Sequence, residues 1–409
     1  MNLSIKYSTL YFIVDLIIFL TVYLSSAKSL YLGSLLLLIY IFYFIIFKHV
    51  NFKDFKPYLV FIFEFFILIF LGIISLNSSN THDILRDAIY FIYPLLCIIY
   101  GSLFFKKMSI QKIFNLIIFS GIFVSITPLL SFVRNPMLFQ DSLREIRIDN
   151  GNGYIASIIA LIILLLIYNP FKIKKVTNFF SIFVLLCALL LSFSRTSYIV
   201  GILGLFFFYF VSKNKIKNLN TIFILLIFST FALSFVPKEI INDFTIKILN
   251  GVNEVKGSQL WDWQSINENW RGYENFKAVQ LFKNSSIFNK IFGFGLGSYL
   301  PIDLEILLSG KYYSAIPLLH NEYFTVLLKT GIVGLMLNIV IHIQLLYKSY
   351  KIKDHYAKWF AIFLTIVLSF EGVIVRGVFN PEAGLFCLSL LGGLISIDHD
   401  ERKNDVRIE

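Results

Sequence analysis

The chain alternates between long apolar runs and short polar connections along most of its length. A membrane-spanning helix needs about 20 predominantly apolar residues, because about 30 Å of hydrocarbon is crossed at about 1.5 Å per residue. These runs are continuously apolar, whereas the strands of a membrane barrel would alternate with a period of two. The pattern therefore predicts an all-α polytopic membrane protein with about twelve spans, at residues 8–27, 29–47, 57–76, 86–105, 110–133, 153–170, 178–194, 196–212, 219–237, 318–347, 357–376 and 381–397.

Composition supports a bilayer location. Apolar residues make up 57% of the chain and charged residues only 15%, whereas soluble proteins carry about a quarter of charged residues. The net charge of +11 comes from lysines that cluster in the connections between apolar runs and do not follow one face. We therefore attribute the charge to membrane topology and expect no nucleic-acid partner.

The lysines also predict the orientation of the spans. Every second connection is rich in lysine, and short cytoplasmic connections are the ones that carry such clusters. Both termini are then cytoplasmic, and the long connection faces outward. The expected organisation is spans one to nine in residues 1–237, an extracytoplasmic loop at 238–316, spans ten to twelve at 317–397 and a cytoplasmic tail at 398–409.

The arginines show the opposite distribution to the lysines. By this topology, seven of the nine lie on or near the outer side: Arg86, Arg134, Arg144, Arg147, Arg195, Arg271 and Arg376. A guanidinium group offers a planar fork that binds phosphate through two hydrogen bonds, which an ammonium group cannot do. Outer-side phosphate binding is one interpretation, and snorkelling to the interface is the other.

The outer loop contains three of the four tryptophans, Trp261, Trp263 and Trp270. They are either interfacial anchors or, together with Tyr273 and Asn321, candidates for binding sugars. Residues 271–284 have helical spacing and predict a short helix on the membrane. The glycines of 293–298 predict a tight turn or close backbone approach, with an anion-binding nest of amides as the alternative.

Two of the six histidines, His82 and His320, are placed by the predicted topology where they could serve outer-side chemistry. Histidine suits proton transfer near neutral pH. Because His320 stands two residues before Glu322 at an expected helix start, these two residues are the catalytic candidates. A polar cluster that only ends a helix is the alternative. No motif with metal-ligand spacing accompanies them, and we expect neither a metal nor a cofactor.

At these residues the sequence resembles the bacterial O-antigen polymerases (Wzy type) and O-antigen ligases. The resemblance rests on Ser194-Arg195-Thr196, Arg271, Gly293 to Ser298, His320 to Tyr323 and Gly331 to Leu335, in that order. It implies a GT-C-like, metal-independent glycosyltransferase. It also implies that Arg195 and Arg271 hold a lipid diphosphate and that His320 acts as a base or orients the acceptor.

The chemistry of the outer side is compatible with this resemblance. A sugar donor used there has to arrive activated and membrane-bound, as an undecaprenyl (polyprenyl) diphosphate-linked oligosaccharide does. We therefore expect an inner-membrane O-antigen or capsule-type polymerase, with that lipid and a chain-length regulator as candidate partners. The alternatives are an O-antigen ligase that uses lipid A core and, in another class, a lipid-linked oligosaccharide flippase.

Overall fold

The computed structural model describes residues 2–47, 50, 52–76, 80–134, 158–162, 175–211, 215–234, 236–246, 261–308 and 311–406. Within these residues the chain is helical apart from one β-hairpin. The long helices are α1 (Asn2–Lys28), α2 (Leu30–Phe47), α3 (Leu59–Ile74), α4 (Thr81–Phe105), α5 (Ile110–Arg134), α8 (Lys175–Leu191), α9 (Arg195–Val211), α10 (Lys215–Leu233), α13 (Trp270–Asn284), α15 (Glu322–Tyr350), α16 (His355–Ile374) and α17 (Ala383–Val406). The shorter elements are η1 (Phe52–Tyr58), α12 (Trp263–Glu268), α14 (Ile287–Phe292), η3 (Gly377–Phe379) and the strands β1 (Leu300–Leu308) and β2 (Lys311–Ile316).

The all-α, multi-pass membrane class is confirmed. Seven described helices are long and apolar enough to cross a bilayer, and all seven fall on predicted spans. Three shorter apolar helices, at Phe179–Leu191, Arg195–Val211 and Ala383–Asp398, coincide with three more. Most of the predicted span at 153–170 lies outside the described residues. The count of twelve therefore stays a prediction, as do the domain boundaries.

Contacts divide the chain into two units. The first comprises Met1–Ala27, Lys107–Ile248 and His355–Trp359, and the second Lys28–Lys106, Leu249–Asp354 and Phe360–Glu409. In the first unit α5 packs on α8, and α8, α9 and α10 contact one another. An ion pair between Lys112 and Asp15 (2.7 Å) joins α5 to α1 within this unit.

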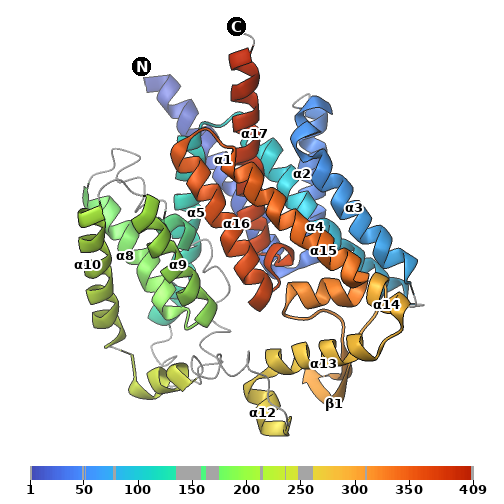
Figure 1. Cartoon of the computed structure of the whole chain (residues 1–409). Coiled ribbons are helices and arrows are strands. Elements are labelled where there is room, and N and C mark those ends of the chain that lie inside the picture. Colours follow the sequence, from blue (N-terminus) through green and yellow to red (C-terminus); the bar gives the residue numbers. More distant parts are fainter. Residues whose placement is uncertain are drawn as a thin grey trace. The chain divides into compact units, whose positions relative to one another are not determined.

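The second unit is built around the long contact of α4 with α17, with α2 and α3 also on α4 (Figure 1). The two helices approach closely at Gly101 and Gly392, where any side chain would collide with the backbone at Ser389 and at Ile98. Small residues allow this closeness, which membrane helices use because burial from water does not drive them together. The side chain of Tyr58 adds a hydrogen bond to the Gly392 carbonyl (2.6 Å).

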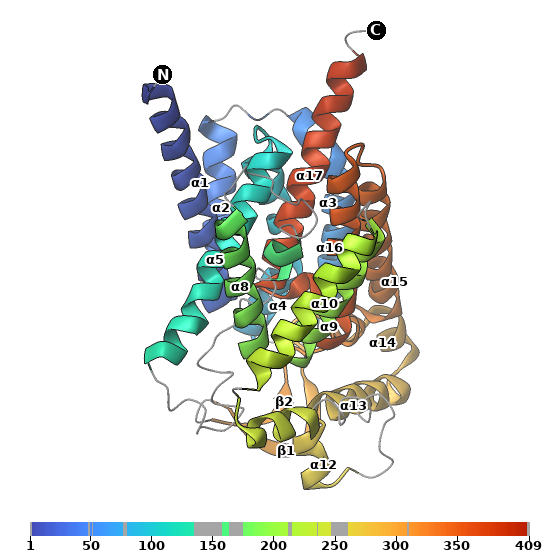
Figure 2. The same cartoon turned by 90° about the vertical axis from the view of Figure 1, so that its left-hand side faces the viewer.

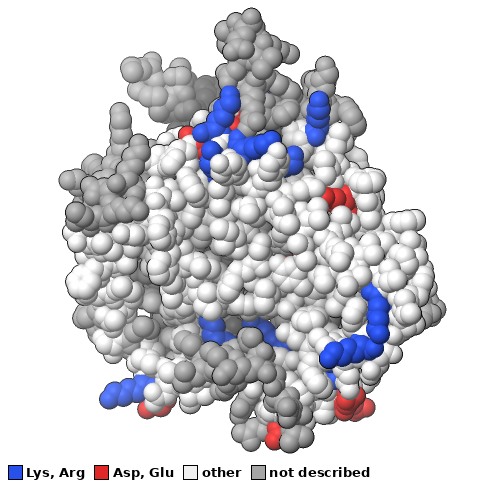
Figure 3. Space-filling model, viewed as in Figure 1, with Lys and Arg blue, Asp and Glu red and all other residues white. Residues whose placement is uncertain are grey.

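One end of the second unit carries α12, α13, α14 and the hairpin, away from the C-terminal end of α17 (Figures 1 and 2). Over α15 and α16 the middle of the surface in Figure 3 is without charged side chains, and lysines and arginines gather nearer its ends. This is the distribution expected of helices in a bilayer. The end with α12–α14 coincides with the predicted extracytoplasmic loop.

The antiparallel hairpin of β1 and β2 is an element that the sequence analysis did not predict. Together with α12 and α13 it encloses a small core of Ile266, Tyr273, Ile302 and Ile316. The prediction of a helix at 271–284 is confirmed by α13. Because Tyr273 and Ala278 of α13 are buried, much of this helix packs against protein.

Helix α15 is broken at Gly331, whose φ of 67° and ψ of −165° are not helical. In a straight helix, residues 16 positions apart would be about 24 Å apart. Here the Glu322 carboxylate accepts a hydrogen bond from Asn338 Nδ2 at 2.7 Å. Residues 322–330 therefore form a separate short helix that folds back on residues 332–350. The span predicted at 318–347 was continuous and did not include this break.

We expect Gly331→Ala to destabilise the second unit by about 1–3 kcal/mol. Gly331 has positive φ, and a Cβ there would collide with the Ile291 carbonyl. The apparent Tm of the purified protein, followed by size-exclusion chromatography after heating, measures the effect. Gly201→Ala is the control, because its Cβ would meet only the end of the Leu189 side chain at 3.3 Å. Equal Tm values for the two variants would contradict the structural role of the break.

Candidate active site

His320 is paired with Glu274, an acidic residue of α13. His320 Nδ1 lies 3.0 Å and 2.9 Å from the two carboxylate oxygens of Glu274. The backbone amide of His320 also donates to Glu274, at 3.1 Å. The Glu274 side chain is 2% exposed and that of His320 is 38% exposed. The acid is therefore buried behind an imidazole that reaches the surface.

Local structure determines both positions. Trp270 and Glu274 stand one turn apart on α13, so Trp270 Nε1 can donate to Glu274 Oε1 (2.6 Å) and hold the carboxylate. His320 directly precedes Asn321, which caps the N-terminus of α15 by accepting from the Phe324 amide (3.2 Å). The cap determines where the helix begins, and thereby where the preceding residue, His320, lies.

The pairing also determines the tautomer of His320. An ionised carboxylate only accepts hydrogen bonds, so Nδ1 has to carry the proton that it shares with Glu274. No described residue is hydrogen-bonded to Nε2, the other ring nitrogen. In the neutral ring Nε2 then has a free lone pair. This is the arrangement of a general base that is oriented by a buried carboxylate.

Glu322, the other catalytic candidate, has a different environment. Its carboxylate is fully buried and accepts from Asn338 Nδ2 (2.7 Å), from His342 Nε2 (2.8 Å) and from the Val378 amide (2.9 Å). His342 in turn contacts the Ser369 hydroxyl at 2.9 Å. Both oxygens of Glu322 are occupied by internal donors, so this residue ties the start of α15 to the later part of α15 and to η3, and His342 extends the network to α16.

The two arginines of the resemblance lie in different units. Arg271 is half-buried in the first turn of α13, three residues before Glu274. Arg195 is the first residue of α9 in the first unit, after the short break at Ser192–Ser194 that separates α8 from α9. Arg271 thus lies on the same helix, α13, as Glu274, the partner of His320.

Most of the aromatic candidates pack on the small core that α12, α13 and the hairpin enclose. Trp261 packs edge-on against Tyr273 (ring centroids 5.4 Å apart), and Tyr273 is itself buried. Trp270 packs on the same core and bonds Glu274. Asn321 is buried as a helix cap. Trp263, 58% exposed, is the candidate whose ring remains most available to a sugar.

The glycine-rich segment after α14 supports the close-approach interpretation. Phe294 N and Gly295 N donate to the carbonyls of Leu328 and Lys329 (2.8 and 3.1 Å), which the break at Gly331 leaves without helical partners. Leu296 N donates to Gly72 O at 2.9 Å. These amides are therefore used within the protein, which leaves no nest for an anion.

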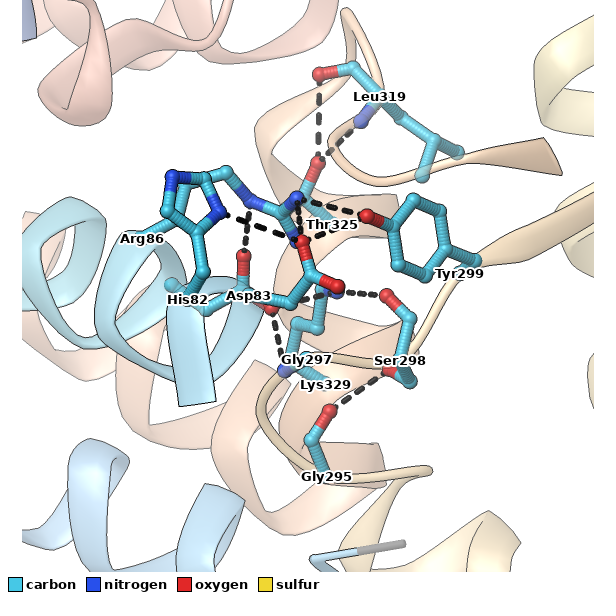
Figure 4. A network of polar contacts seen from close by, with 11 residues as sticks. His82, Asp83, Arg86, Gly295, Gly297, Ser298, Tyr299, Leu319, Thr325 and Lys329 are labelled. Carbon is cyan, nitrogen blue, oxygen red and sulfur yellow. Dashed lines mark hydrogen bonds and ion pairs between the residues drawn. The ribbon is translucent and has the colours of Figure 1, made fainter. Parts of the chain in front are cut away.

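A cluster of four charged side chains lies beside this segment (Figure 4). Arg86 bonds Asp83 (2.8 Å) and Asp87 (2.9 Å), and Lys329 pairs with Asp87 at 2.7 Å. Asp87 also accepts from the Gly297 amide at 2.7 Å, and Lys329 donates to the Ser298 carbonyl. Two positive and two negative charges balance here, so the cluster fastens α4, α15 and the glycine-rich segment together.

Tyr299 also belongs to this cluster, because its hydroxyl contacts two of the charged side chains. Its hydroxyl donates to Asp83 at 2.6 Å and lies 3.2 Å from Arg86. Burial, together with the hydrogen bond to Asp83, raises the pKa of Tyr299 above its ordinary value. The phenol therefore keeps its proton at neutral pH and remains a donor to Asp83.

Glu274, Lys329 and the two aspartates were not among the site residues predicted from the sequence. A signal for the aspartates was present, because Asp83, Arg86 and Asp87 stand at i, i+3 and i+4 on one helix face. Trp270 and Glu274 show the same i, i+4 spacing. Nothing in the sequence indicated that Glu274 meets His320, 46 residues later, because that contact depends on how α13 packs.

Comparison with known proteins gives one finding. No curated protein and no solved structure matches the chain. Residues 180–339 match the family model described as O-antigen ligase. The matched segment contains Arg195, Arg271, Glu274, His320 and Lys329, and it ends before α16. The match confirms the resemblance to the O-antigen ligase and polymerase family that the motifs between 190 and 340 indicated.

Proposed function

We propose that the protein is a polysaccharide polymerase of the outer face of the inner membrane. It transfers a growing glycan from polyprenyl diphosphate to a sugar hydroxyl of the next lipid-linked repeat unit. The matched family implies an O-antigen ligase or polymerase type of role in lipopolysaccharide assembly. The observation that carries the proposal is the His320–Glu274 pair, in which no described residue is hydrogen-bonded to Nε2 and the His320 side chain is 38% exposed.

In the proposed reaction, His320 Nε2 takes the proton from the acceptor hydroxyl. The acceptor oxygen forms a bond to the anomeric carbon of the donor glycan, and the bond from that carbon to the diphosphate oxygen breaks. Polyprenyl diphosphate leaves as an anion. Glu274 stabilises the positive charge that develops on the imidazole, as a buried carboxylate does in other base-orienting pairs.

Following the resemblance, we assign Arg195 and Arg271 to the donor diphosphate. Arginine suits this role because hydrogen bonds aimed at the leaving group stabilise the negative charge that develops on it. Trp263 is the candidate for stacking on a sugar. The role needs no cofactor, and we propose that it needs no metal.

The ligase is the alternative within the same family. It would use the same His320 pair and the same donor, but its acceptor would be lipid A core. The polymerase and the ligase share their motifs, so the two activities have to be distinguished by the identity of the reaction product. A flippase has less support, because the family model that residues 180–339 match is described as O-antigen ligase, which is an enzyme and not a transporter.

For the topology we propose cytoplasmic termini and an outer α12–α14 region. After replacement of Cys97, Cys187 and Cys387, a cysteine at Asn284 should react in intact cells with a membrane-impermeant maleimide. A cysteine at His355 should react only after the membrane is permeabilised. Both positions are exposed, so access to the reagent and not burial decides the labelling. The reverse labelling pattern would overturn the orientation and every outer-side assignment.

We expect His320→Ala to lower the rate of glycan transfer by about 10²- to 10⁴-fold, the usual contribution of a general base. The assay uses purified protein, lipid-linked repeat units and EDTA, and resolves products by length. His82→Ala is the matched control, since the proposed topology also puts His82 on the outer side and its side chain is 76% exposed. Wild-type protein that extends only lipid A core would identify a ligase, and activity abolished by EDTA would remove the metal-independent mechanism.

We expect Glu274→Gln to lower kcat by at least about tenfold while leaving the KM for the lipid-linked donor nearly unchanged. The amide keeps the size of the side chain but loses the charge that holds Nδ1–H and stabilises the imidazolium. Glu305→Gln, on an exposed position of β1, is the control. If Glu274→Gln retained the wild-type kcat, Glu274 would contribute only to packing.

A further inference from the structure

Arg376 has a backbone conformation that is unusual for a residue with a side chain. With φ of 77° and ψ of 0° it lies in the left-handed region. Phe193 is the only other non-glycine residue of the described chain with positive φ. Such a conformation costs free energy and persists only where the surrounding structure holds it. Strained residues of this kind concentrate at functional sites.

The bend at Arg376 is held from two other helices. The Val378 amide donates to the Glu322 carboxylate at 2.9 Å, which ties the bend to the start of α15. From α4, Tyr90 stacks on Phe379 with ring centroids 4.7 Å apart. Tyr93, also from α4, donates to the Pro381 carbonyl at 2.7 Å. These contacts over-determine the bend, and they give the buried Glu322 a role as a positioning residue.

The same bend brings Arg376 to the backbone that directly precedes His320. Arg376 Nε donates to the carbonyl of Leu319, the residue before His320, at 3.3 Å. Glu322, two residues after His320, bonds the residue two positions after Arg376. Two segments that are 56 positions apart are therefore fastened together on both sides of the candidate base.

Arg376 differs from Arg86 in how its charge is balanced. Arg86 forms ion pairs with Asp83 and Asp87. Arg376 is half-buried, and among the described residues no carboxylate pairs with it and none accepts from its two terminal nitrogens. An arginine without a counter-charge near the bilayer is costly. A bound anion would remove that cost.

We propose that Arg376 binds a phosphate group of the polyprenyl diphosphate substrate beside His320. Nε is engaged by Leu319, which leaves the two terminal nitrogens of the fork for phosphate oxygens. The residue lies outside the segment that matches the family, so the proposal stands on the geometry of this chain. The identity of the lipid rests on the proposed function.

Arg376→Gly is the decisive variant, because glycine adopts positive φ without strain and keeps the bend while removing the guanidinium. It is made in the His320→Ala background, so that binding is measured without turnover, with undecaprenyl diphosphate as the probe. We expect the Kd to rise at least about tenfold, the Tm to stay equal or increase, and binding of undecaprenol, which has no phosphate, to stay unchanged. Arg134→Gly, at an exposed end of α5, is the control. An unchanged Kd for the diphosphate would overturn the proposal.

Both the donor and the acceptor of a polymerase carry a diphosphate. A second measurement determines which of the two diphosphates Arg376 binds. With wild-type His320, the KM of Arg376→Lys is compared for a repeat unit on polyprenyl diphosphate and for the same unit on a neutral alkyl chain as acceptor. A higher donor KM with both acceptors assigns Arg376 to the donor. A higher KM only for the diphosphate acceptor assigns it to the acceptor. Tight binding that depends on Arg376, in a protein that transfers no glycan, would overturn the proposed function and leave the phosphate site standing.

Discussion

The helix break at Gly331 is the constraint on which the end of the second unit that carries α12–α14 and the hairpin depends. A helix that ends at Thr330 leaves backbone carbonyls without partners, and in a membrane protein such groups have to be satisfied by the protein itself. The amides of Phe294 and Gly295 meet this need. Because those amides belong to the segment between α14 and β1, the break also determines where the hairpin and α13 lie.

The short helix at residues 322–330 is fastened at both ends by charged or polar groups. At its C-terminal end Lys329 pairs with Asp87, and at its N-terminal end Glu322 bonds Asn338, His342 and Val378. Each of these bonds compensates for the contacts with water that a charged group loses when it is buried. His320 leaves this fixed helix at its capped end. The candidate base is therefore positioned by the second unit as a whole and not by a flexible loop.

Two acidic residues near His320 have contrasting environments. Glu322 is surrounded by donors on both oxygens and faces the interior, whereas Glu274 directs its carboxylate at Nδ1 of His320. Proximity in sequence favoured Glu322 as the acidic partner. Spatial contact favours Glu274, which α13 brings to the histidine from 46 positions away. Arg376 likewise contacts a residue that is distant in sequence, Leu319.

The sequence by itself determined the membrane class and gave the expected orientation and the candidate histidine, because hydropathy, lysine clustering and residue chemistry are local properties that can be read along the chain. It also indicated the helix at 271–284 and a close backbone approach at 293–298. It did not reveal the break at Gly331, since a glycine inside an apolar run is compatible with a continuous helix. The partners of His320, the balance of charge around Arg86 and the bend at Arg376 were decided only by tertiary structure, because each depends on contacts between residues that are far apart in the chain.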